Sequence, residues 1–63
     1  MTAESVTLSR RVAQLMNTEV IRALSVRQRS RLAHEVMEAR RFEDLRPETR
    51  ALILAAEQEA AAG

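Results

Sequence analysis

His34 and a few serines are the side chains of this sequence that could act as a general base or a nucleophile. The serines are Ser5, Ser9, Ser25 and Ser30, and the 63 residues include no cysteine. We expect His34 to be a solvated side chain with no acid to orient it. We expect the serines to lie at helix starts and on polar helix faces, which serine favours. A nucleophile needs a base held beside it. We therefore predict no catalytic residues and no enzymatic activity.

The composition gives little support for metal or cofactor chemistry. A single histidine cannot form a histidine-based zinc site, and a chain without cysteine has no thiolate ligands. The only glycine is Gly63, so a glycine-rich phosphate loop cannot form. A helical chain of this length rarely encloses a concave pocket. We therefore predict no metal, no cofactor and no small-molecule substrate.

The charged residues divide the chain into a basic half and an acidic half. Residues 1–31 carry six arginines and two glutamates, whereas residues 32–63 carry four arginines and seven acids. The absence of lysine is typical of GC-rich genomes, and the composition resembles that of small proteins from actinobacteria and their phages. Arginine also forms two-point contacts with carboxylates and phosphates. The two halves offer a partner, or another copy of the chain, surfaces of opposite charge.

Four arginines of the basic half are candidate nucleic-acid contacts. In this alternative, the chain before Ser25 forms a helix-turn-helix, and the helix that begins after Ser25 contacts phosphates or guanine edges. The turn lacks glycine, and the segment 18–24 fits the motif's spacing poorly. The alternative function is therefore a small DNA-binding regulator. Its candidate contacts are Arg10, Arg11, Arg27 and Arg31.

Strong helix formers dominate the sequence, and its valines do not alternate with polar residues as in a strand. We predict an all-α fold, a small bundle of three helices at residues 8–24, 26–41 and 47–60. The whole chain forms a single small domain. The terminal segments 1–6 and 61–63 are expected to fray.

The first predicted helix contains a conflict that favours a break near Asn17 and Thr18. A continuous helix places Glu19 in the middle of the apolar face and Ile21 on the polar face. A break with Thr18 as the N-cap of a short helix removes both conflicts. A continuous helix to Leu24 stays open, so the bundle has three helices, or four short ones.

Capping residues mark the starts of the later helices. Ser25 and Gln28 have the spacing of a capping box, and Pro47 fits the first position of a helix. Phe42 and Leu45 flank the last turn and should anchor it. The predicted apolar helix faces are Leu8, Val12, Leu15 and Met16; Val26, Leu32, Ala33, Val36 and Met37; and Thr49, Leu52, Ile53, Ala56 and Ala60.

Arg29 and Arg40 fall within the predicted apolar stripe of the helix at 26–41. A buried guanidinium must be paired, because an isolated charge is costly to desolvate. In one alternative the aliphatic stems pack and the charged groups reach water. In the other, Glu19 pairs with one of the two arginines, within the fold or across an interface between copies.

The segment 51–56 is the most apolar hexamer, and one helix face cannot absorb all of it. If Leu52 and Ile53 face the core, Leu54 projects on the opposite side among alanines, which let another helix approach. The alternative is that Leu54 is a single exposed leucine without a binding role. The predicted protein-binding or oligomer interface consists of Leu52, Ile53, Leu54, Arg29 and Arg40.

The small size of the core predicts a partner. Eleven of the hydrophobic residues are alanine, and a domain of this length is marginally stable without disulfides or metals. We therefore predict a small non-catalytic protein-interaction module, regulatory or structural, that binds a protein or forms a homo-oligomer. The sequence shows no membrane-spanning run and no signal segment. We expect no membrane association and a cytoplasmic location.

Overall fold

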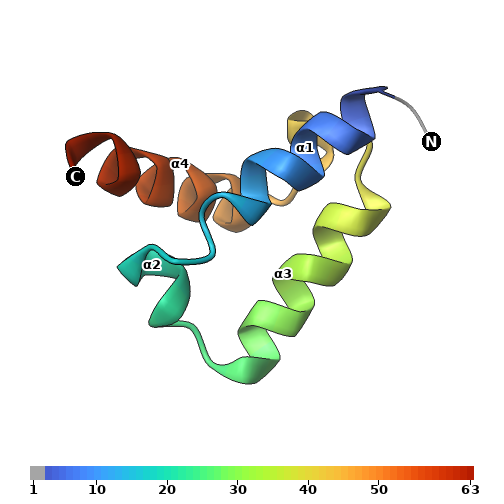
Figure 1. Cartoon of the computed structure of the whole chain (residues 1–63). Helices are drawn as coiled ribbons and strands as arrows, with labels where there is room; N and C mark the ends of the chain where they lie inside the picture. The colour runs from blue at the N-terminus through green and yellow to red at the C-terminus, as the bar shows by residue number, and fades with distance from the viewer. Residues whose placement is uncertain (1–2) are drawn as a thin grey trace.

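The computed structural model describes the backbone of residues 3–63 and the side chains of residues 7–63. Within that part of the chain the structure is helical and contains no strand, which confirms the all-α prediction (Figure 1). The elements are α1 (Ala3–Ala13), α2 (Glu19–Arg22), α3 (Val26–Glu38), the 3-10 turn η1 (Phe42–Asp44) and α4 (Pro47–Ala62).

The first predicted helix is divided in two. α1 ends at Ala13, and a turn leads to α2, for which Thr18 is the N-cap. The Thr18 hydroxyl accepts from the N–H of Ile21 at 3.4 Å and donates to the carbonyl of Leu15 at 2.6 Å. The break turns Ile21 into the core and leaves Glu19 exposed. The alternative of a break is therefore confirmed, and the continuous helix at 8–24 is wrong.

α3 begins at the predicted residue but ends three residues early. The Ser25 hydroxyl accepts from the N–H of Gln28 at 3.1 Å, and the Gln28 amide oxygen accepts from the N–H of Ser25 at 2.8 Å. This confirms the capping box. At the other end Ala39 is extended and buried. The helix therefore stops before Arg40 and Arg41, which lie in an exposed connection.

α4 begins at Pro47, as predicted, and continues beyond the expected end. It runs through residues 61–62, where we expected fraying, because alanine is the best helix former. α1 likewise includes residues 3–6, and residues 1–2 lie outside the described part of the chain.

At the N-termini of two helices, carboxylates from other helices accept hydrogen bonds. Glu35 of α3 accepts from the N–H of Arg46 at 2.7 Å and from the hydroxyl of Thr49 at 2.8 Å, at the start of α4. Glu59 of α4 accepts from the first two N–H groups of α2 at 2.7 and 3.1 Å. Helix N-termini carry unsatisfied N–H groups and partial positive charge, so both carboxylates are well placed there.

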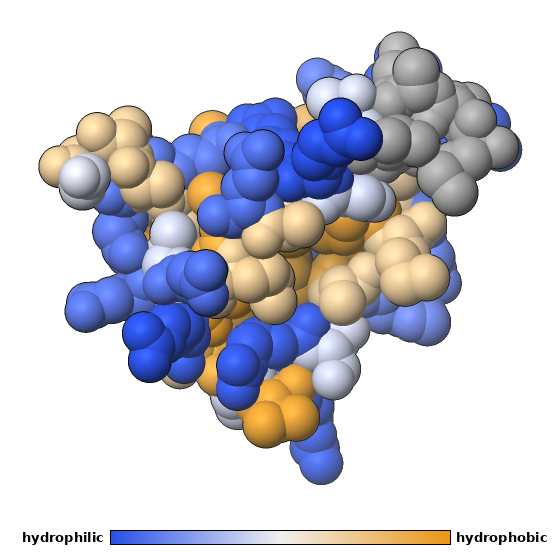
Figure 2. Space-filling view, viewed as in Figure 1, coloured by the Kyte–Doolittle hydropathy of each residue, from blue (hydrophilic) through white to orange (hydrophobic). Residues whose placement is uncertain are grey.

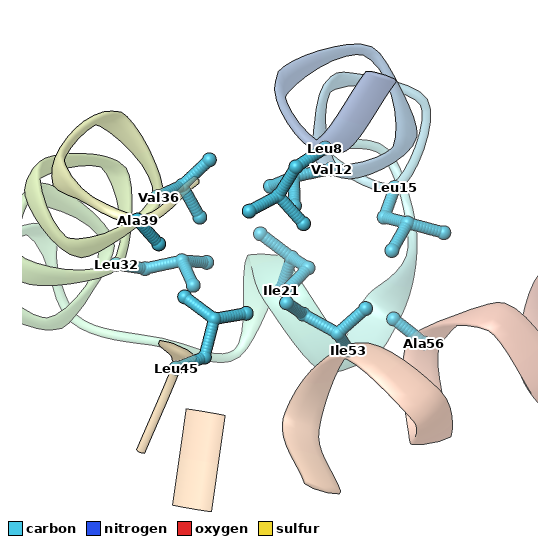
Figure 3. Packing of buried hydrophobic residues seen from close by; sticks show 10 residues of the cluster. All are labelled: Leu8, Val12, Leu15, Ile21, Leu32, Val36, Ala39, Leu45, Ile53 and Ala56. Atoms are coloured by element: carbon cyan, nitrogen blue, oxygen red, sulfur yellow. The ribbon is translucent and has the colours of Figure 1, made fainter. Parts of the chain in front are cut away.

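The core lies where α1 packs against α3 and α2 packs against α4. Ile21 and Ile53 are fully buried and face each other in Figure 3, with the leucines and valines of α1 and α3 around them. Leu45 is buried and Phe42 partly buried, so both anchor the turn as predicted. The buried hydrophobic residues are Leu8, Val12, Leu15, Ile21, Leu32, Val36, Ala39, Leu45, Ile53 and Ala56.

Several residues of the predicted helix faces are not in this core. Met16 is 42% exposed, Val26 73% and Met37 79%. Ala33 and Ala60 are exposed as well. Helical periodicity identifies an apolar face but does not say how much of it the neighbouring helices cover. Three of these residues, Met16, Ala33 and Met37, line one groove.

Candidate protein-binding groove

An apolar groove of about 240 Å³ lies between α1 and α3, and we call it the α1–α3 groove. Ala13 at the end of α1 and Met16 in the turn after it line the groove, together with Arg29, Ala33 and Met37 of α3. Core residues of both helices also line it. In Figure 2 apolar colours gather on the face between these two helices. The groove therefore exposes apolar surface that the described residues do not cover.

Arg29 is the one charged residue that lines this groove. Its Nε–H is buried and has no hydrogen-bond acceptor. Among the described residues no carboxylate forms an ion pair with it. A buried donor without an acceptor costs about 1–3 kcal/mol. The groove therefore holds a guanidinium that would gain from a carboxylate brought by a partner.

The predicted pairing of Glu19 with Arg29 or Arg40 is not formed in the fold. Glu19 is exposed, and its backbone N–H donates to Glu59. Arg40 lies beyond the end of α3 and is exposed, so its placement within an apolar helical stripe was wrong. Of the two arginines, only Arg29 lies against apolar side chains.

Of the three α4 residues predicted to form an interface, only Leu54 lies on the side of the helix that faces away from the core. Ile53 is fully buried, so the prediction that it contacts a partner is wrong for this fold. Leu52 is partly buried and packs against the core. Leu54 is 47% exposed. The exposed residues around it, which we call the outer face of α4, are Glu48, Ala51, Leu54, Ala55 and Gln58.

Arg11 joins three elements of the fold. Its Nε and Nη2 donate to the two carboxylate oxygens of Glu57 at 2.5 and 2.8 Å. This hydrogen bonding lowers the pKa of Glu57 and raises that of Arg11, each against a smaller opposing effect of burial. The guanidinium also lies 4.4 Å from the ring centroid of Phe42. Arg11 is thus engaged within the fold, which weakens its assignment as a nucleic-acid contact.

The other candidate nucleic-acid contacts are exposed. Arg10 lies at the end of α1, and Arg27 and Arg31 lie one turn apart on α3. Arg27 and Arg31 line an open depression of about 540 Å³ with Arg46. The same depression is lined by the carboxylates of Glu35, Glu38 and Asp44. Its charge is therefore mixed, which suits a polyanion less well than a uniformly basic surface.

Ser30, His34 and Glu38 follow one another at four-residue spacing on the exposed side of α3. His34 Nε2 lies 3.2 Å from a carboxylate oxygen of Glu38. The expectation that no acid orients His34 was therefore wrong, and the four-residue spacing between the two residues indicates the contact. Both side chains are exposed to water, and no hydrogen bond between Ser30 and His34 is formed. A catalytic triad depends on a preorganised hydrogen bond from nucleophile to base, so we assign no chemistry to this row.

A further open depression, of about 740 Å³, lies beside Arg11 and Phe42 and is lined by residues of both charges. Among the described residues, no three histidine, aspartate or glutamate side chains are grouped so that they could hold a metal ion. In the same part of the chain, no helix combines the length and apolar character needed to cross a membrane.

Comparisons with known proteins found no match to this chain, whether among family models, curated proteins or solved structures.

Proposed function

We propose that this chain is a small non-catalytic protein-interaction module, regulatory or structural, that binds a partner helix in the α1–α3 groove. The observation that carries the proposal is the open apolar groove flanked by exposed Met16 and Met37. Apolar side chains that stay in water beside so small a core mark a surface for a partner. Methionine adapts to many partner shapes and is common at such surfaces. The proposal includes a cytoplasmic location.

The dimensions of the groove support a helix as the partner. Its volume of about 240 Å³ is below the usual range for small-molecule sites, which is about 300–1,000 Å³. Two helices form its walls, and a third helix can lay apolar side chains at one-turn spacing between two others. Arg29 supplies one polar contact that can fix the orientation of the bound helix.

Site-specific photo-crosslinking in cells that produce the chain tests this function. A benzophenone amino acid at position 37 lies on the groove wall, whereas the same residue at position 26 is similarly exposed on α3 but outside the groove. We expect position 37 to give a protein adduct, identified by mass spectrometry, that position 26 does not give. Ala33→Glu in the position-37 variant should remove this adduct. Equal adducts from both positions, or none from position 37, contradict the proposal.

A DNA-binding regulator is the second candidate function, and one observation favours it. Arg27 and Arg31 are exposed one turn apart near the start of α3, and they line one depression together with Arg46. Binding through phosphates weakens steeply as salt rises. Fluorescence anisotropy with a labelled duplex, for the natural chain and for Arg27→Ala with Arg31→Ala, tests this candidate. A duplex affinity that the double substitution leaves unchanged would count against it.

A further inference from the structure

We propose that the helix bound in the α1–α3 groove is α4 of a second copy of this chain, docked through its outer face with Glu48 beside Arg29. This inference rests on the proposed function, because it names the occupant of the groove. Each copy carries the apolar α1–α3 groove, whose one charged residue is Arg29. Each copy also carries the outer face of α4, which is rich in alanine and whose one charged residue is Glu48. The two surfaces lie on different helices of the molecule, so one copy can offer its α4 to the groove of another.

The outer face of α4 has the shape that a narrow groove requires. At about 100° per residue, Ala51 and Ala55 lie between Glu48 and Leu54 around the helix. The short alanine side chains therefore face the floor of the groove and let the helix approach closely. Leu54 and Glu48, at the two edges of the face, then reach opposite walls. Leu54, which is 47% exposed in the single chain, becomes covered.

The charges of the two surfaces are complementary. Arg29 is the one charged residue among those that line the groove, and its Nε–H has no acceptor. Glu48 is the one charged residue of the outer face, and within the described part of the chain its carboxylate forms no ion pair or hydrogen bond. A carboxylate beside Arg29 forms a charge-assisted contact with its guanidinium. A symmetric contact of groove against groove instead brings two Arg29 side chains together, and like charges at an interface are unfavourable.

The spacing along the two helices is also compatible. Each residue of a helix advances by about 1.5 Å, so Leu54 lies about 9 Å beyond Glu48. Along α3, Ala33 and Met37 lie about 6 and 12 Å beyond Arg29. A helix that runs parallel to α3 with Glu48 beside Arg29 therefore places Leu54 between the levels of Ala33 and Met37.

The contact joins copies head to tail. After one groove is filled, the second copy still has an empty groove and the first still has an uncovered outer face, so further copies can add in series or close into a ring. A contact of standard size covers about 800 Å² of each partner. This is about one sixth of the 4823 Å² surface of the single chain, so one copy has room for both contacts.

This head-to-tail arrangement has a distinctive test by light scattering after size exclusion. We expect the mass of the natural chain to increase with concentration. Met37→Glu blocks the groove and Leu54→Glu blocks the outer face, and both positions are exposed, so both variants should keep the helical circular dichroism spectrum of the natural chain. Each variant alone should be a monomer. An equimolar mixture should form a dimer and nothing larger, because only one intact groove and one intact outer face can meet.

Val26→Glu is the matched control, since Val26 is 73% exposed on α3 but does not line the groove. This variant should associate like the natural chain. Glu48→Arg and Arg29→Glu should each weaken association by about tenfold, and a mixture of the two variants should recover it, because the opposite charges then meet again. Arg29 contacts the core, so the Glu48→Arg variant gives the cleaner measurement.

Three results overturn the inference: a natural chain that stays monomeric at all concentrations, a mixture of the two blocked variants that stays monomeric, or a Leu54→Glu variant that associates normally. These results do not overturn the proposed function. If position 37 then crosslinks to a different protein in cells and position 26 does not, the groove binds a helix of that protein. Crosslinking of the chain to itself at position 37 supports both the proposed function and the docking of α4 from a second copy.

Discussion

Arg11 and Glu57 form a two-point ion pair between α1 and α4 across a sequence separation of 46 residues. The ring of Phe42 lies against the same guanidinium. Arg11, in the last turn of α1, therefore contacts both Glu57 and Phe42. The side chains of Arg11 and Glu57 are 36% and 31% exposed, so water screens their attraction in part. The pair therefore acts mainly by fixing where α4 crosses α1.

Glu57→Gln should make the stability of the chain less dependent on pH. The pKa of Glu57 is lowered by the hydrogen bonds from Arg11, so the pair stabilises the fold above the usual pKa of glutamate and loses this effect as pH falls through the lowered value. At neutral pH the substitution should cost about 1 kcal/mol. Urea unfolding followed by circular dichroism should show this difference shrinking in acid. Glu48→Gln, at an exposed carboxylate with no partner in the single chain, is the control at a concentration where the chain is monomeric. Equal pH profiles for Glu57→Gln and the natural chain would contradict the prediction.

Arg29→Met should stabilise the single chain. The substitution keeps an unbranched side chain in the groove and removes the buried Nε–H that has no acceptor. The gain should be about 1 kcal/mol, measured by urea unfolding at a concentration where the chain is monomeric. Arg27→Met, at an exposed position of the same helix, should change the stability very little. A loss of stability in Arg29→Met would show that the guanidinium is satisfied, for example by water.

Glu59→Ala should loosen α2 without unfolding the rest of the chain. The Glu59 carboxylate accepts from the first two N–H groups of α2, and the substitution leaves both without a partner from the protein. Loss of a helix cap costs about 1 kcal/mol. Amide hydrogen exchange should accelerate at the residues of α2, while the amides in the middle of α3 keep their protection. Uniform acceleration along the chain would instead mean that the carboxylate holds the whole fold.

Adjacent residues of α4 should respond very differently to alanine. Ile53 is fully buried, so Ile53→Ala removes core contacts and should cost about 2–5 kcal/mol, enough to unfold much of so small a domain. Leu54 is 47% exposed, and Leu54→Ala should change the stability of the monomer by less than about 0.5 kcal/mol. Thermal unfolding followed by circular dichroism compares the two variants directly. Similar melting temperatures would show that Ile53 is not a core residue.

Local signals predicted the helix starts well. Thr18, Ser25 and Pro47 each act within one turn of their own position, so the sequence around them is enough to place α2, α3 and α4. The conflict between Glu19 and Ile21 likewise indicated the break, because both lie on the same short segment. The early end of α3 was not predictable in this way, since Ala39 has an extended backbone and lies in the core among residues from other segments.

Contacts between distant segments could not be predicted from these signals. Glu35, Glu57 and Glu59 bind groups 11 to 46 residues away, and nothing in their local sequence distinguishes them from solvated acids. For the same reason Met16 and Met37 were assigned to the core, although the gap between α1 and α3 leaves both in water. The α1–α3 groove was therefore not predicted, and only Arg29 and Leu54 remain from the interface proposed on sequence grounds.

The carboxylates that start α2 and α4 make helix formation depend on tertiary contacts. α2 has only four residues, too few to be stable alone, and its first N–H groups bind a side chain from the last turns of α4. The start of α4 in turn binds a side chain of α3. Neither helix can complete its N-terminus until a remote part of the chain has folded. The N-terminus of α2 therefore depends on α4, and that of α4 on α3, so removal of the last turns of α4 should release α2 while α3 stays folded.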